Sequence, residues 1–279
     1  MIGPGGPRPP VLAAAVFLLG CHAERGPYLA TVSSHWKLVW WDEFTAPAID
    51  LSRWEYEVNG QGGGNNELQY YTARPRNAFI REGGLVIRAL KEDYAGPDGP
   101  REFTSARIRT SGRGDWTYGR IEARARMPEG QGLWPAIWML PTDTLYGGWA
   151  ASGEIDIVEL VGHEPNRIYG TVHFGGRWPA NVHEGGSWTL PAESFSDDFH
   201  LFAVEWDPAE IRWYVDGHNY HTQADWWSEG GPFPAPFDHD FHLLLNVAVG
   251  GNWPGLPDTT TVFPQEMVVD YIHVFQRPE

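Results

Sequence analysis

Three acidic residues lie close together in one short apolar segment of the sequence. Residues 153–160 read Gly-Glu-Ile-Asp-Ile-Val-Glu-Leu, so Glu154, Asp156 and Glu159 stand among β-branched and aliphatic side chains. Such residues favour a strand, in which side chains alternate between two faces, and Glu154 and Asp156 therefore share one face. Carboxyl groups that act in pairs are the groups that hydrolyse glycosidic bonds. The segment predicts a carbohydrate-cleaving site.

Glu159 breaks the alternation of this strand. Strict alternation would place its carboxylate on the side of Ile155, where an unpaired buried charge is costly. One β-bulge near Val158 would return Glu159 to the face of Glu154. At about 3.3 Å per residue, the Cα atoms of the two glutamates would lie roughly 13 Å apart, and inward-leaning side chains would bring the carboxyl groups to about 5 Å, the spacing of a retaining glycosidase. Crowding should raise the pKa of at least one of these acids.

The composition agrees with a sugar ligand and argues against other classes. The 279 residues include 36 Asp and Glu but 20 Lys and Arg, a formal net charge of −16 without a basic cluster, so no nucleic acid is expected as partner. The 15 Trp exceed what a core needs, and indole rings suit stacking on the apolar face of a sugar. The 11 His form no HExxH pair and there is no G-x-S-x-G elbow, so we expect no cofactor for catalysis.

Strands and turns must position these groups, because from His35 onward short apolar runs recur between Gly- and Pro-rich turns without a convincing amphipathic helix. In residues 120–127 every second side chain is apolar, which predicts a strand with one buried and one wet face. Further strands are expected over 85–90, 168–174, 199–206, 241–249 and 267–275, a hairpin over 211–220 with a type I′ turn at Asp216-Gly217, and loops over 61–66, 94–100 and 142–152. We therefore predict one all-β sandwich domain over 35–279.

The amino end predicts export. Residues 1–10 contain one cation, Arg8, and residues 11–20 are apolar, a stretch that as a helix would cover roughly 15 Å, about half of a bilayer core. This pattern predicts a secretory signal over 1–20. Cys21 follows Leu-Leu-Gly and resembles the lipidated cysteine of a bacterial lipobox; a free thiol is the alternative. We expect a linker over 21–34, membrane contact only through lipidated Cys21, a place on the periplasmic or outer side of the cell envelope, and a monomer.

On these residues the sequence resembles glycoside hydrolase family 16. Residues 154–159 are similar to the longer, bulged active-site motif of laminarinase-like endo-β-1,3-glucanases. The resemblance continues through residues 40–44, 65–72, 104–108, 132–141, 170–174 and 245–253. It implies a concanavalin A-like β-jelly-roll sandwich of two curved antiparallel sheets with an open cleft on the concave face. It also implies a retaining endo-β-1,3-glucanase that hydrolyses laminarin-like and mixed-linkage glucans by double displacement.

The resemblance also implies residue roles. Glu154 would be the nucleophile, Glu159 the acid and base, and Asp156 the residue that tunes the pair. The substrate-binding residues it implies, together with the strand alternation, are Asn66, Arg107, Trp134, Trp138, His173, Asn246 and Trp253. Four of them keep structural alternatives: a core position for Trp138, a buried histidine at His173, turn formation at Asn66 and a surface salt bridge at Arg107. A structural calcium ion is implied on the convex face, with backbone oxygens near Glu43 and Gly83 and the side chain of Asp270 as ligands.

Two other functions compete with a glucanase. The first is a non-hydrolytic β-glucan-binding protein on the same fold, against which the presence of both Glu154 and Glu159 argues. The second is an enzyme of the same family that acts on agar, carrageenan or xyloglucan. Because no Arg or Lys cluster lies near the acidic motif, a sulfated substrate is disfavoured. The loop over 142–151, which contains Tyr146 and Trp149, departs in composition from laminarinases.

Overall fold

The computed structural model describes Met1 and residues 35–278. The signal over 1–20, the lipidated Cys21 and the linker to residue 34 lie outside the described residues, apart from Met1 itself. Residues 35–279 form one unit by their contacts. Among the described residues there is no helix with the length and apolar character to cross a membrane.

The first of two sheets has ten strands. They are β1 (Lys37–Asp42), β3 (Gln69–Tyr71), β4 (Ala78–Arg81), β5 (Gly84–Gly96), β6 (Gly99–Ser105), β9 (Gly119–Arg126), β14 (His200–Trp206), β15 (Ile211–Val215), β16 (His218–Gln223) and β18 (Gln265–Gln276). Their order is β16-β15-β14-β9-β18-β5-β6-β3, with β1 beside β18 and β4 beside β5. Every pair is antiparallel except the parallel pair of β3 with β6.

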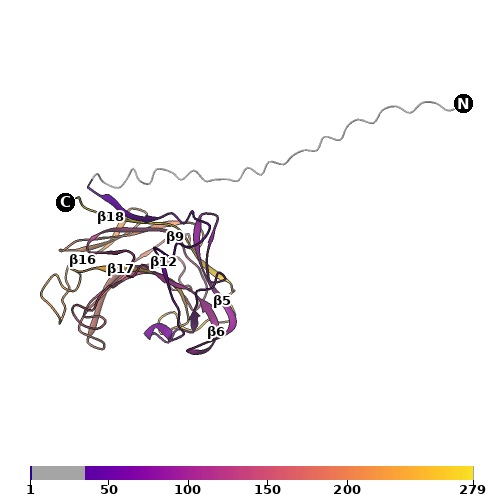
Figure 1. The fold of residues 1–279 in the computed structure, drawn as a ribbon, viewed down its shortest axis with the longest axis horizontal. Coiled ribbons are helices and arrows are strands. Elements are labelled where there is room, and N and C mark those ends of the chain that lie inside the picture. Colours follow the sequence, from indigo (N-terminus) through magenta and orange to yellow (C-terminus); the bar gives the residue numbers. More distant parts are fainter. Residues whose placement is uncertain (2–34, 279) are drawn as a thin grey trace. The chain divides into compact units, whose positions relative to one another are not determined.

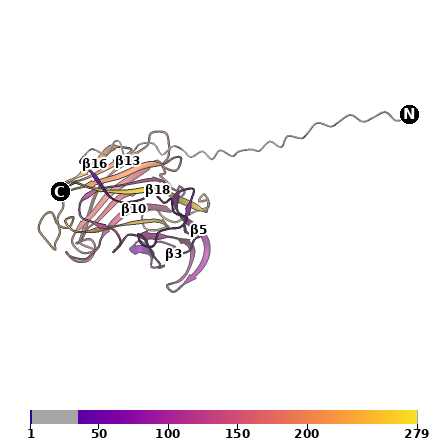
Figure 2. The same ribbon diagram turned by 45° about the horizontal axis from the view of Figure 1, so that its top comes forward.

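The second sheet has eight strands. They are β2 (Glu55–Glu57), β7 (Arg107–Arg109), β8 (Asp115–Trp116), β10 (Leu133–Pro141), β11 (Glu154–Glu159), β12 (Arg167–Gly175), β13 (Asn181–Thr189) and β17 (Phe241–Val249). The order is β13-β12-β11-β10-β17-β7-β2, with β8 beside β17. A short 3-10 turn, η2 (Gly62–Gly64), lies between β2 and β3. Figures 1 and 2 show the curved strands of the two sheets stacked on each other.

One apolar core fills the space between the sheets. The strand β9 contributes Ile121 and Ala123 from the first sheet, and β11 contributes Ile155 from the second, all without exposed surface. Removing apolar surface of this kind from water stabilises the fold by about 25 cal/mol per Å². The all-β sandwich of two antiparallel sheets, a jelly roll, is therefore confirmed.

Two local expectations were wrong in instructive ways. The face of β9 that was expected to be exposed to solvent is buried at Glu122, which is 3% exposed. Arg120 lies 2.9 Å from the Glu122 carboxylate, and His273 also lies near it. The loop expected over 94–100 is a hairpin instead, since β5 extends to Gly96 and β6 begins at Gly99. The Tyr94 ring packs 5.0 Å from that of Tyr70, so contacts distant in sequence extend the strands through this Gly- and Pro-rich segment.

The hairpin between β15 and β16 is confirmed. Val215 pairs with His218, and Asp216 and Gly217 have φ values of 48° and 78°. Positive φ at both central residues is what a type I′ turn requires.

Candidate active site

The strand β11 contains the expected bulge. Next to β10, Ile137 pairs with Val158 and Trp138 pairs with Asp156, so Ile157 is the extra residue without a partner. The bulge therefore lies beside Val158, where the sequence predicts it. A bulge inserts one residue into the alternation and changes which side chains share a face.

The bulge brings the three acids to one face of the second sheet, which we call the carboxylate face. Glu154 pairs with His173 on β12 and Glu159 pairs with Tyr169, with the register shift between these two pairs. Residues that pair across antiparallel strands point to the same side, so these aromatic side chains accompany the acids. The carboxyl separation of about 5 Å expected for a retaining enzyme stays a prediction.

A tryptophan of the first sheet holds the bulge from behind. The fully buried Trp213 of β15 donates a hydrogen bond from Nε1 to the backbone oxygen of Asp156 at 2.8 Å. Gly170 on β12 provides the space, because a Cβ atom there would lie 2.2 Å from the Trp213 ring. A bulge interrupts the ladder of backbone hydrogen bonds, so this indole supplies a donor that the sheet does not. Analysis of the sequence did not identify Trp213.

Each glutamate accepts a hydrogen bond from a tryptophan. Trp149 Nε1 donates to Glu154 Oε2 at 2.7 Å, and Trp134 Nε1 donates to Glu159 Oε1 at 3.0 Å. Trp134 was expected at the site. Trp149 was noted only as part of an unusual loop, although a large aromatic residue five positions before the first glutamate was the available signal. The two indoles fix the orientation of both carboxyl groups.

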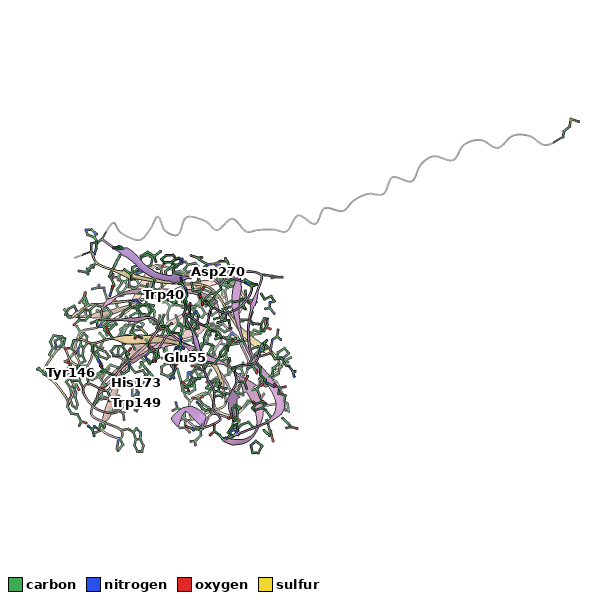
Figure 3. The ribbon with its side chains drawn as sticks, viewed as in Figure 1. Trp40, Glu55, Tyr146, Trp149, His173 and Asp270 are labelled. Carbon is green, nitrogen blue, oxygen red and sulfur yellow. The ribbon has the colours of Figure 1, made fainter. Side chains whose placement is uncertain are left out.

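His173 lies beside the acids, as its strand position predicts. Its Nε2 atom is 3.3 Å from Asp156 Oδ2 and 3.6 Å from Glu154 Oε1. Its ring centroid is 5.5 Å from that of Trp149, and Figure 3 shows these two side chains together, with Tyr146 farther out. Burial alone would lower the pKa of His173, but the adjoining Asp156 and Glu154 raise it to about 9. A protonated imidazole therefore balances the acids at neutral pH.

Glu154, Asp156 and His173 form the only group of acids and histidines in the described part of the chain that is compact enough to hold a metal ion. One ligand atom each from Glu154, Asp156 and His173 lie within 4.8 Å of one another. In this structure the Nε2 atom of His173 lies 3.3 Å from Asp156 Oδ2, so the imidazole pairs with the acids of the cluster.

Burial and mutual repulsion raise the pKa values of both glutamates. Burial, followed by the charge of Asp156, raises the pKa of Glu154 to about 8. The same two causes raise the pKa of Glu159 well above its usual range. The His173 charge acts in the opposite direction on both, and the indole of Trp149 on Glu154. The indole of Trp134 likewise opposes the rise at Glu159. The expected rise is confirmed for both glutamates, and at Glu154 the charge of His173 and the indole of Trp149 limit the rise without cancelling it.

The His173→Gln variant tests this balance. Removing the cation should raise the pKa of Glu154 and of Glu159, so both limbs of the pH profile of kcat/KM should move to higher pH by roughly one unit. The profile is measured on laminarin, with the exposed His218→Gln as control. A profile that stays in place, or moves to lower pH, would show that no positive charge on His173 lowers the pKa values of the two glutamates.

A second cluster lies on the carboxylate face, over β10, β17 and β7. Trp138 Nε1 and Arg107 Nε both donate to Asn246 Oδ1, at 2.9 and 3.1 Å. Arg107 is buried and lies 3.2 Å from Glu57 and 3.7 Å from Glu67, so it is not a surface salt bridge. The Trp138 ring is partly exposed and also receives the Arg107 guanidinium at 5.2 Å. Arg107 and Asn246 therefore fix the position of Trp138, which is the most exposed member of this cluster, and sugar contacts by all three stay a prediction.

Trp253 joins the Glu159 end of the site. Its exposed ring lies 5.4 Å from that of Trp134 and 5.0 Å from that of Tyr169. Asn66 is on a neighbouring loop, where it has a positive φ and donates to the side chain of Asn252 at 2.8 Å. The structure brings Trp253 to the acids, whereas Asn66 contacts the loop that carries Trp253 rather than an acid.

The residues expected to bind calcium lie elsewhere in the fold. Figure 3 shows Asp270 on the first sheet, away from His173. Asp270 Oδ2 accepts a hydrogen bond from Arg124 at 2.9 Å, and the side chain of Glu43 contacts His273 at 2.7 Å. A calcium ion would compete with Arg124 for the only side chain proposed as ligand, since Glu43 and Gly83 would offer backbone oxygens. The Asp270 carboxylate is therefore already engaged by Arg124, and the calcium site stays a prediction.

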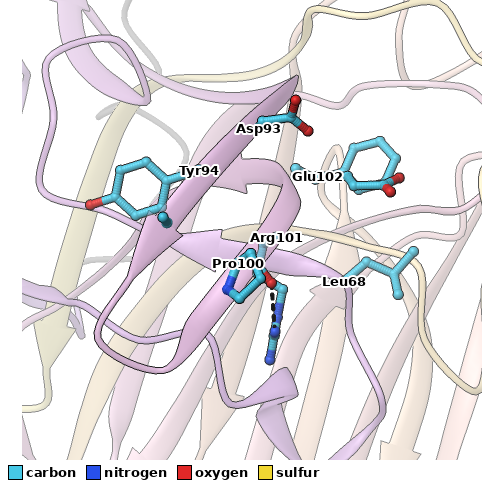
Figure 4. A pocket seen from close by; sticks show the side chains of 8 residues that line it. Leu68, Asp93, Tyr94, Pro100, Arg101 and Glu102 are labelled. Atoms are coloured by element: carbon cyan, nitrogen blue, oxygen red, sulfur yellow. Dashed lines mark hydrogen bonds between the residues drawn. The ribbon is translucent and has the colours of Figure 1, made fainter.

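A separate hollow of about 550 Å³ lies at the hairpin of β5 and β6. Leu68, Asp93, Tyr94, Pro100, Arg101 and Glu102 line it, together with Ala95 and Phe103 (Figure 4). None of the residues expected at the active site is among them.

Comparison with known proteins identifies the family. The model named "Glycosyl hydrolases family 16" matches residues 65–272. The chain belongs to glycoside hydrolase family 16. This family 16 chain is 45% identical over 279 residues to a beta-glucanase of Rhodothermus marinus, covering 94% of the chain and 92% of that relative. It is 39% identical over 292 residues to glucan endo-1,3-beta-glucosidase A1 of Niallia circulans, covering 98% of the chain but 42% of that longer protein.

Solved structures agree with this family assignment. The laminarinase catalytic domain of Thermotoga maritima superposes on the family 16 chain with a TM-score of 0.79 and 43% identity. The match covers 88% of this chain and 99% of that domain. The protein is therefore a glycoside hydrolase, as its acidic motif and its similarity to these enzymes show.

Proposed function

We propose that the protein is a retaining endo-β-1,3-glucanase that hydrolyses laminarin-like and mixed-linkage β-glucans. The observation that carries the proposal is the bulge at Ile157, which puts Glu154 and Glu159 on one face, each held by an indole N–H. Two carboxyl groups held on one strand in this way suit a double displacement. The names of the relatives, a beta-glucanase and a glucan endo-1,3-beta-glucosidase, support the substrate class.

In the first step, the Glu154 carboxylate attacks the anomeric carbon of a glucosyl unit. The bond to the leaving oxygen breaks as Glu159 gives that oxygen its proton, which leaves a glycosyl ester on Glu154 and an ionised Glu159. Burial and the charge of Asp156 raise the pKa of Glu159 and so favour the protonated form that donates this proton. The N–H of Trp149 and the charge of His173 stabilise the ionised Glu154 before attack.

In the second step, Glu159 acts as a base. It takes a proton from a water molecule, whose oxygen attacks the anomeric carbon and releases Glu154 as a carboxylate. Glu159 is then protonated again, and the new reducing end has the β configuration of the substrate. Loss of the Glu154 charge in the ester lowers the pKa of Glu159, which favours its change from acid to base.

The competing functions find less support. A binding protein would not need two carboxyl groups buried together, since burying acids in this way is costly. For a sulfated polysaccharide the nearby cations would have to be free, yet Arg107 pairs with Glu57 and Arg109 with Glu55. A neutral glucan needs no such charge and suits the tryptophans of the site.

Proton NMR of the full chain acting on laminarin and on mixed-linkage glucan tests the proposal. We expect an early β-anomeric signal at the new reducing end, followed by mutarotation. An early α signal would exclude retention, and no new reducing end on either glucan would exclude hydrolysis of these substrates.

We also propose that the protein is exported and tethered to the cell envelope through lipidated Cys21, which rests on the sequence alone. The Cys21→Ser variant should leave the membrane fraction, and retention there would contradict a lipid anchor.

A further inference from the structure

Two tryptophans are unusually exposed at the end of β12. Trp178, in the loop between β12 and β13, is 71% exposed, and Trp227, in the segment after β16, is 49% exposed. Isolated exposed apolar residues are common on protein surfaces, but indoles of this size gathered beside a catalytic site are typical of ligand contacts. We call Trp178 and Trp227 the tryptophan rim.

Backbone hydrogen bonds hold both rim residues in place. The Trp178 N–H donates to the oxygen of Trp149 at 2.9 Å. Gly175 at the end of β12 donates its N–H to the oxygen of Trp227 at 3.0 Å and accepts from the N–H of Glu229, also at 3.0 Å. The two segments are therefore anchored to β12 and to the loop of Trp149, so the indoles are presented by ordered backbone.

The position of Gly175 shows on which face Trp227 lies. Gly175 follows His173 by two residues on β12 and pairs with Asn181, so a side chain there would point to the carboxylate face. A Cβ atom on Gly175 would lie 3.2 Å from the Trp227 ring. The Trp227 indole therefore covers the carboxylate face just beyond His173, in the space that the glycine leaves open.

A row of aromatic side chains extends from the acids across β12 to β13. Trp149, which donates to Glu154, lies 5.5 Å from the His173 ring, and His173 lies 5.7 Å from the His183 ring on β13. This row extends from β11 toward β12 and β13. The cluster of Trp138 lies on the opposite side of β11, over β10 and β17. The acids thus lie between two aromatic regions, one over β12 and β13 and the other, which contains Trp138, over β10 and β17.

We propose that the tryptophan rim binds a further glucosyl unit of the glucan chain, on the β12 and β13 side of the acids. The proposal rests on the proposed glucanase function. An uncharged pyranose has an apolar face of C–H groups that an indole can cover, while its hydroxyl groups stay in water. The exposed rim needs no charge for this ligand. It is linked to the site by the backbone hydrogen bond from Trp178 to Trp149 and by the position of Trp227 over Gly175, two residues after His173.

The test uses the full chain with Trp178→Ala, Trp227→Ala and the double variant. The control is Trp41→Ala, because Trp41 is also about half exposed but lies on β1 of the first sheet. The substrates are end-labelled β-1,3-gluco-oligosaccharides of increasing length and laminarin. We expect the double variant to raise KM for long chains about tenfold, to leave the shortest cleaved chain nearly unaffected, and to move the position of cleavage by one unit.

The outcomes separate the rim from the proposed function. Hydrolysis of laminarin by the wild type tests the glucanase, whereas the comparison with the variants tests the rim. An unchanged KM and cleavage pattern in a double variant with the melting temperature of the wild type would overturn the rim proposal. If the wild type does not hydrolyse laminarin, its binding constant for laminarin is compared with that of the double variant, and equal constants would overturn the proposal as well.

Discussion

Glu154→Ala should lose hydrolysis of laminarin by at least about 10⁴-fold while the protein still binds the glucan. The loss follows because no other described carboxylate can replace Glu154. Trp149 orients the Glu154 carboxylate, whereas the neighbouring Asp156 carboxylate lies against His173. Removing one of three crowded acids should not unfold the chain, since their repulsion is reduced.

Azide makes this prediction specific for a nucleophile. The truncated side chain leaves a space on the side of the sugar from which Glu154 would attack, and azide that enters it should form an α-glycosyl azide from an activated aryl β-glycoside. The product is identified by NMR. Unchanged hydrolysis in Glu154→Ala would remove this residue from the mechanism, and a β-azide would assign it to the acid and base role.

Glu159→Ala should lower kcat on laminarin by about 10²- to 10⁴-fold. The poor leaving group of a polysaccharide needs the proton that Glu159 holds through its raised pKa. An aryl glycoside whose phenolate leaves without protonation should therefore form the glycosyl ester nearly as fast as in the wild type. The ester should then accumulate, because no base activates water in the second step.

Azide should rescue Glu159→Ala with the opposite stereochemistry. It attacks the ester on Glu154 from the side of the missing carboxylate, so a β-glycosyl azide is expected. Glu102→Ala, an exposed glutamate on β6, is the matched control and should behave as the wild type. Equal losses on laminarin and on the aryl glycoside would argue that Glu159 does not protonate the leaving group.

The acidic strand could be predicted because its signals are local. Alternation along residues 154–157 places Glu154 and Asp156 on one side and Ile155 in the core, and backbone geometry alone requires this. Strict alternation would bury the Glu159 carboxylate in the core, so the sequence also predicts a bulge. The position of the extra residue could be estimated only to within one place, because pairing with β10 decides which residue is left without a partner.

The contacts between distant segments could not be read in the same way. Nothing near Trp213 in the sequence indicates that its indole donates to Asp156, since the two residues belong to different sheets. Arg107 and Asn246 were expected to touch sugar, which stays a prediction; that both are buried and that both contact the cluster of Trp138 could not be read from the sequence. Their burial depends on Glu57 and Glu67 from other segments.

The sequence by itself determined the all-β class, the acidic motif and the expectation of a carbohydrate ligand, because composition and period-two alternation can be read from a few neighbouring residues. The tertiary structure alone decided which indole holds each glutamate, how closely His173 lies to Asp156 and Glu154, and that Trp227 covers the carboxylate face. Hydrogen bonds, burial and charge interactions depend on distances in space, which strand pairing and the packing of the two sheets establish only when the whole domain is folded.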